Sequence, residues 1–202
     1  MRVYLDNNAT TMLDPESYEL MLPFFMEKFG NPNSLYDFGS ETHRALRVAM
    51  DQIYAGIGAK DSDDVVITSC STESNNWVLK GIYYDKIITG EKDHIIVSAV
   101  EHPSISATCE FLKKLGVRIS KIPVKIDGSI DPSDLREIID DKTALVSVMW
   151  ANNETGVIFP VKELADIAHE FGALFHTDAV QATGKIKVNV CAADVDFLSF
   201  SA

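Results

Sequence analysis

The segment HTDAVQATGK, His176–Lys185, places residues that can do chemistry at the end of an apolar run. Asp178 comes three residues after Phe175, so its carboxylate is expected at the mouth of a sheet. A carboxylate so close to a core is costly unless it is paired. The residues alone leave three roles open: a turn former, a metal ligand together with His102 and His176, or the partner of a cationic group in a cleft.

Other polar clusters also follow apolar runs. The four hydroxyl residues within Thr68–Thr72 suit ordinary helix capping, which is the simpler reading, but they also suit a phosphate held by backbone N–H groups at a helix start. His102 precedes Pro103, where an imidazole can stack on a flat ligand, bind a metal or cap a helix. Asn152 and Asn153 favour turns and offer side-chain donors to a cleft.

The elements that must position these residues alternate along the chain. Apolar runs predict strands, and stretches at helical spacing between them predict helices. This alternation predicts an α/β fold with a mostly parallel sheet and helices on both faces. Ligands of such sheets lie beyond the carboxyl ends of the strands. The expected strands are 65–67, 94–97, 117–124, 145–149, 173–175 and 197–200, and the first forty residues are expected to be irregular before a helix over 46–57.

Composition excludes several classes of protein. The chain has 202 residues, 46% of them hydrophobic, and a net charge of −12. Without a basic run, this charge argues against a nucleic-acid binder. No apolar run approaches the ~18 residues of a membrane span, and MRVYLDNNATT lacks the apolar core of a signal peptide. Three widely spaced cysteines fit reduced thiols, so we expect a cytoplasmic protein with no membrane partner.

Taken together, the polar clusters match the needs of one cofactor. Pyridoxal 5′-phosphate requires phosphate donors, a flat group against its ring, donors for its ring oxygen and a carboxylate that keeps its pyridine nitrogen protonated. A metal site has no use for the serine–threonine cluster. The clusters therefore favour pyridoxal phosphate and no metal.

Seven motifs in order resemble the cysteine desulfurases of the NifS/IscS type. These are fold-type-I pyridoxal-phosphate enzymes of the class-V aminotransferase family, and the resemblance covers the whole chain. Each motif alone is weak, and their common order is what makes them specific. The motifs are YLDNNATT (4–11), GNPNS (30–34), TSCSTESNN (68–76), SAVEHPS (98–104), NNETG (152–156), HTDAVQATGK (176–185) and SFSA (199–202).

The resemblance implies a role for each matched residue. Asp178 would pair with the pyridine nitrogen, and His102 would stack on the ring and carry protons in catalysis. Gln181 would contact the ring hydroxyl, and Asn153 the ring oxygen or the bound amino acid. The remaining implied residues are phosphate donors (Ser71, Thr72 and Ser201) and residues near the substrate (Asn7, Asn8 and Ala9).

The resemblance also implies an activity and a domain plan. Such an enzyme converts L-cysteine to L-alanine and passes the sulfur, as an enzyme persulfide, to an iron–sulfur scaffold protein; it is expected to be a homodimer. Residues 1–14 would belong to a small domain at the active-site edge, and residues 15–202 to a cofactor-binding large domain that is incomplete at its C-terminal end. In relatives the cofactor lysine and the sulfur-accepting cysteine come later, so we expect these residues to be the N-terminal half of a chain of about twice this length.

Alternatives remain at this point. The chain could belong to another fold-type-I enzyme, such as a selenocysteine lyase, a sulfinate desulfinase or an aminotransferase, or to a non-catalytic binding or regulatory subunit. A metal hydrolase built from His102, His176 and Asp178 is a third possibility. Cys70 replaces a glycine that is usual in the family. We expect it to be a small packing residue and expect Cys109 and Cys191 to be structural too.

Overall fold

Five parallel strands form one sheet in the order β2-β1-β3-β4-β5. The computed structural model describes residues 1–201. Each strand falls where an apolar run predicted one, and the parallel α/β sheet is confirmed. The strands are β1 (His94–Ser98), β2 (Arg118–Ile122), β3 (Thr143–Ser147), β4 (Leu174–Asp178) and β5 (Phe197–Ser199).

The chain divides into two compact units, Met1–Val65 and Val66–Ala202, which are described separately. The first unit contains α1 (Pro15–Met26) and α2 (Asp37–Ile57). The second contains the sheet and the helices that cover it. These are α3 (Ser71–Ile82), the π-helical turn η1 (Tyr83–Ile87), α4 (Pro103–Lys114), α5 (Pro132–Ile138), α6 (Val161–Glu170) and α7 (Val190–Ala193).

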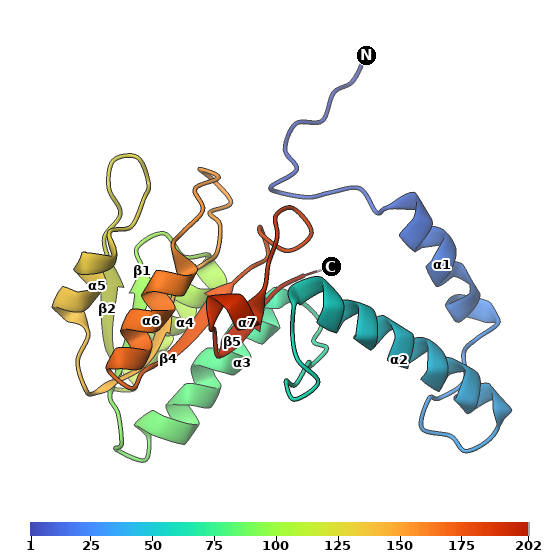
Figure 1. Cartoon of the computed structure of the whole chain (residues 1–202), viewed down its shortest axis with the longest axis horizontal. Coiled ribbons are helices and arrows are strands. Elements are labelled where there is room, and N and C mark those ends of the chain that lie inside the picture. Colours follow the sequence, from blue (N-terminus) through green and yellow to red (C-terminus); the bar gives the residue numbers. More distant parts are fainter. Residues whose placement is uncertain (202) are drawn as a thin grey trace. The chain divides into compact units, whose positions relative to one another are not determined.

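The helices of the second unit cover both faces of the sheet (Figure 1). Alternate strand residues point to opposite faces, so Ile95 packs with Leu79 of α3 and Leu112 of α4, whereas Ile96 packs with α5 and α6. The direction in which successive strands are added to the sheet reverses at β1, because β2 lies on one side of it and β3, β4 and β5 lie on the other. In parallel sheets, the crevice at such a reversal is where ligands bind.

Two predictions about local structure are wrong. The first forty residues are not all irregular: α1 begins at Pro15 because the Asp14 carboxylate accepts the N–H groups of Glu16 and Ser17, at 2.9 and 3.1 Å. Residues 65–67 form no strand, since no described segment pairs with them, and the side chains of Val66 and Ile67 are exposed. A β-branched run needs a partner backbone before it becomes a strand.

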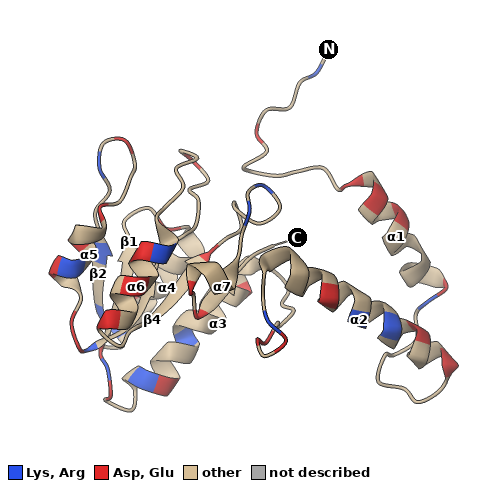
Figure 2. Ribbon diagram, in the orientation of Figure 1, with Lys and Arg blue, Asp and Glu red and all other residues tan. Residues whose placement is uncertain are grey.

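Charged residues of both signs alternate on the helix surfaces of the second unit, for example on α5 and α6 (Figure 2). At the start of β2, Arg118 binds both Asp93 and Asp140, with N–O distances of 3.0 and 2.8 Å. Among the described residues, no helix has the length and apolar character needed to cross a membrane.

Candidate functional site

Asp178 is the last residue of β4 and is buried, with 7% of its surface exposed. Its Oδ1 accepts the Val180 N–H at 3.1 Å, and its Oδ2 accepts Asn75 Nδ2–H at 2.7 Å. None of the ion pairs formed within residues 1–201 involves Asp178. The carboxylate therefore forms the turn after β4, as one reading predicted, and it is also a buried anion that suits a cationic ligand.

The start of α3 is not capped by a hydroxyl side chain, so that simpler reading is wrong. Cys70 occupies the N-cap without a side-chain capping hydrogen bond, and the N–H of Ser71 has no acceptor among the described residues. The Ser69 hydroxyl and N–H instead bind the Glu73 carboxylate, both at 2.7 Å, and thereby lower the pKa of Glu73. Free N–H groups beside hydroxyls at a helix start are a suitable site for a phosphate.

His102 occupies the N-cap of α4, directly after the end of β1. Its Nδ1 accepts the Ser104 N–H at 3.2 Å and lies 2.8 Å from Ser104 Oγ. Capping thus uses one ring nitrogen and leaves Nε2 for another partner. The exposed imidazole can both start the helix and contact a ligand.

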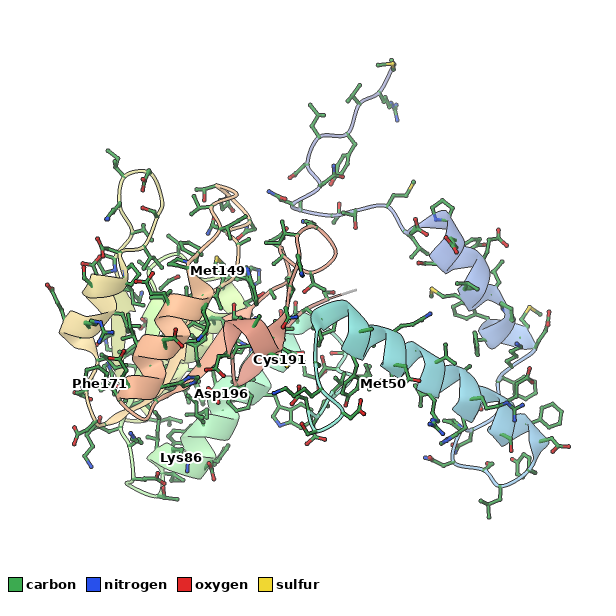
Figure 3. The ribbon with its side chains drawn as sticks, viewed as in Figure 1. Met50, Lys86, Met149, Phe171, Cys191 and Asp196 are labelled. Carbon is green, nitrogen blue, oxygen red and sulfur yellow. The ribbon has the colours of Figure 1, made fainter. Side chains whose placement is uncertain are left out.

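Glu101, beside His102, is a buried acid that the sequence did not single out. Its Oε1 accepts Ser98 Oγ–H at 2.5 Å and the Met149 N–H at 2.9 Å, and its Oε2 has no hydrogen-bond partner within residues 1–201. Desolvation, and to a smaller extent the charge of Asp178, raise the pKa of Glu101 to about 8 against the opposing effect of these two donors. Glu101 therefore joins the end of β1 to the backbone of Met149, just beyond β3. Met149 is labelled in Figure 3.

His176 does not face the site as a metal ligand would. Its Nδ1 lies 2.8 Å from Ser147 Oγ and its Nε2 lies 3.0 Å from Ser199 Oγ, so both ring nitrogens are engaged by neighbouring strands. Burial lowers the pKa of His176 to about 3 and keeps it neutral. Within residues 1–201, no three His, Cys, Asp or Glu side chains converge to hold a metal ion. The geometry contradicts the metal-hydrolase alternative.

The other predicted residues occupy varied positions. Asn152 forms a turn through its Oδ1, which accepts the N–H groups of Glu154 and Thr155, both at 2.9 Å, while Asn153 is half-buried beside Glu154. Gln181 Oε1 accepts Lys185 Nζ–H at 2.5 Å. Ser201 is exposed after β5. Asn7, Asn8 and Ala9 lie in the unit Met1–Val65, so their contacts with substrate stay predictions.

The three cysteines differ from one another in environment. Cys109 is buried in the core beside α3, as expected, and burial raises its pKa to about 12. Cys70 and Cys191 are exposed, so the expectation that they pack internally is wrong. Cys70 lies at the open start of α3, where the N–H of Glu73 and the hydroxyl of Ser69 lower its pKa.

An open hollow of about 570 Å³ lies elsewhere in the second unit, between the start of α6 and α7. Its lining includes Phe159, Lys162, Lys187 and Asn189. None of the predicted site residues lines it. We place the site at the strand ends because the buried carboxylate and the uncapped helix start are there.

Comparison with known proteins identifies the family of this chain. The model of the class-V aminotransferase family matches residues 3–202, and the chain belongs to this family, whose members depend on pyridoxal phosphate. "Cysteine desulfurase IscS" of Dictyoglomus turgidum is 50% identical over 200 residues, which are 99% of this chain and 50% of that protein. The chain therefore spans about half the length of the curated relatives it matches.

Solved structures share the fold. A structure described as "NIFS-LIKE PROTEIN" superimposes with a TM-score of 0.94 at 38% identity and covers 100% of this chain and 55% of its own. One described as "SspA in complex with cysteine" has a TM-score of 0.91 at 31% identity, covering 98% and 56% of the two chains. The chain, with its parallel sheet, therefore matches about half of a fold-type-I enzyme.

The structure brings in residues that the motifs alone did not assign. Asn75 of α3 and Ser104 of α4 contact each other and reach Asp178 and His102, respectively. One signal was available: Asn75 lies three residues after Thr72, hence on the same side of a helix. That Asn75 meets Asp178, 103 residues away, is not visible in the sequence.

Proposed function

We propose that this chain is part of a pyridoxal-phosphate-dependent cysteine desulfurase, which converts L-cysteine to L-alanine and transfers the sulfur to an enzyme thiol as a persulfide. The proposal rests on membership of the family, on the 50% identity to a protein named cysteine desulfurase, and on the likeness to a structure in complex with cysteine. The conversion balances, because the substrate sulfur joins the enzyme thiol and the carbon skeleton leaves as alanine.

The observation that carries the proposal is the buried carboxylate of Asp178, which has no cation beside it among the described residues. Pyridoxal phosphate supplies an electron-withdrawing ring whose protonated nitrogen needs such an anion. Asp178 would hold that proton in place. Both carboxylate oxygens are already fixed by donors from Val180 and Asn75, so the anion is oriented before any ligand arrives.

The other residues would divide the binding between them. The N–H groups at the start of α3, with the hydroxyls of Ser71 and Thr72, would bind the phosphate, and Ser201 would add a donor. The imidazole of His102 would lie against the ring and would accept or donate protons at Nε2. Asn153 and Gln181 would contact the ring oxygens.

Further parts of the proposal concern the whole protein. Asn7, Asn8 and Ala9 would contribute to substrate binding, as part of a segment 1–14 that belongs to the small domain. The cofactor lysine and the thiol that accepts sulfur would come from residues outside this sequence. We further propose a cytoplasmic homodimer that delivers sulfur to an iron–sulfur scaffold protein.

The test is to incubate the full-length protein with L-cysteine and a reducing thiol and to quantify alanine and sulfide. Asp178→Asn should lower the rate of alanine formation about a hundredfold or more, because losing one member of a buried charge pair costs about 3–5 kcal/mol. Asp141→Asn, at an exposed aspartate of the same unit, is the matched control and should leave the rate unchanged.

Two outcomes would count against the proposal. Undiminished alanine formation by Asp178→Asn would show that the buried carboxylate has no part in the reaction. A full-length protein that releases selenium from selenocysteine but forms no alanine from cysteine would be a selenocysteine lyase of the same fold type.

A further inference from the structure

A continuous chain of hydrogen bonds links Asp178 to His102 through two residues with no assigned role. Asn75 is fully buried in α3, and its Nδ2 lies 2.7 Å from Asp178 Oδ2 and 2.9 Å from Ser104 Oγ. Ser104, in the first turn of α4, lies in turn 2.8 Å from His102 Nδ1. One amide thus connects the end of β4, α3 and the start of α4.

The chemistry of the groups determines the direction of each hydrogen bond. A carboxylate only accepts, so the NH₂ of Asn75 faces Asp178. The second N–H of that amide points to Ser104 Oγ, which therefore accepts and has its own hydrogen available for His102 Nδ1. The backbone N–H of Ser104 also points at Nδ1 and can only donate. His102 consequently carries its proton on Nε2 when it is neutral.

The cost of this arrangement indicates that it is not there for packing alone. Asn75 Oδ1 is buried and has no hydrogen-bond partner among the described residues. An unsatisfied buried carbonyl is unfavourable, and an apolar side chain of similar size would avoid the cost. Local costs of this kind are expected at functional sites.

We propose that Asn75 is a positioning residue that orients the Asp178 carboxylate and, by donating to Ser104 Oγ, turns the hydroxyl hydrogen of Ser104 toward His102 Nδ1. A single amide would then align both groups that engage the cofactor ring in the proposed function, on which this inference rests. Since Asn75 acts through Asp178 and Ser104, it needs no contact with the substrate.

The test uses the full-length protein and two readouts besides activity. The ¹⁵N chemical shift of His102 Nδ1 reports the hydrogen bonds that this nitrogen accepts, with His102→Gln identifying the signals. A titration with pyridoxal phosphate followed by absorbance gives the cofactor dissociation constant. Asn75→Leu should raise that constant about tenfold to a hundredfold, the range found for groups that hydrogen-bond to metal ligands, and should change the Nδ1 chemical shift.

Asn76→Leu is the matched control. Asn76 also links α3 to α4, because its Nδ2 lies 3.4 Å from Ser104 O and its Oδ1 accepts Thr108 Oγ1–H at 3.0 Å, but it does not contact Asp178. Asn76→Leu should leave the Nδ1 chemical shift of His102 and the cofactor dissociation constant unchanged. Equal effects of the two substitutions would overturn the proposal by showing that only the packing of α3 on α4 matters.

Ser104 variants keep the inference testable if Asn75→Leu does not fold. Ser104→Ala removes the hydroxyl beside His102 Nδ1, so it should change the Nδ1 chemical shift, and Ser104→Thr, which retains the hydroxyl, should restore it. A wild-type Nδ1 shift and cofactor affinity in Asn75→Leu, or a wild-type Nδ1 shift in Ser104→Ala, would refute the positioning role. If the wild-type protein binds no pyridoxal phosphate, the proposed function fails instead, and the Nδ1 measurements still decide whether the hydrogen-bond chain exists.

Discussion

Replacing Glu101 with glutamine should change how stability depends on pH. Glu101 is buried at the end of β1, and desolvation raises its pKa from 4.5 to about 8. The folded protein therefore keeps this proton between those two pH values, whereas the unfolded chain releases it. The free energy of unfolding must then fall as pH rises through this window.

The magnitude follows from the width of that window. From 4.5 to about 8 is about 3.5 pH units, and each is worth about 1.36 kcal/mol, so the upper limit is about 5 kcal/mol. The donors Ser98 Oγ–H and Met149 N–H favour the charged form, and the pKa of about 8 already includes their effect. Glutamine resembles the protonated acid in shape and does not titrate. Between pH 5 and pH 8, wild type should therefore lose about 2–4 kcal/mol relative to Glu101→Gln.

The assay is urea unfolding of the full-length protein at several pH values, followed by circular dichroism. Taking the difference between the two proteins removes the titration of all other groups. Glu137→Gln, at an exposed glutamate of α5, is the control and should follow wild type at every pH. A wild-type minus Glu101→Gln difference that stays constant within about 1 kcal/mol from pH 5 to pH 8 would show that Glu101 is ionised throughout and that the desolvation argument fails.

Two further predictions concern the frame around the site. Burial lowers the pKa of His176 from 6.5 to about 3, so the stability that the neutral imidazole contributes is present above pH 6.5 and is lost as pH falls. In His176→Asn, the free energy of unfolding should therefore fall less steeply with decreasing pH, by about 1.36 kcal/mol per pH unit between pH 6 and pH 4. Arg118→Gln breaks exposed ion pairs with Asp93 and Asp140, so at low salt it should lower the free energy of unfolding in urea by less than about 1 kcal/mol. This loss should vanish in concentrated salt, because salt screens exposed charges. An equal loss at both salt concentrations would contradict solvent screening.

Much of the fold was predictable because its signals are local. The runs that became β1 to β5 are short, apolar and separated by helical spacing, and this alternation specifies a parallel sheet. The two failures have different origins. The cap at Asp14 was a local signal that the pattern of apolar residues does not contain, and Val66 and Ile67 had the composition of a strand without a neighbour to pair with.

The candidate site also combines features that the sequence predicts with contacts that only the structure shows. The sequence by itself placed Asp178 and His102 after strands and Thr72 at a helix start, because residue type and position within an element are properties of neighbouring residues. Only the tertiary structure decided that Asn75 would join Asp178 to Ser104, and that Glu101 would bind the backbone of Met149. Those contacts link residues 103, 29 and 48 positions apart, and they depend on strand order and helix docking, which no local pattern encodes.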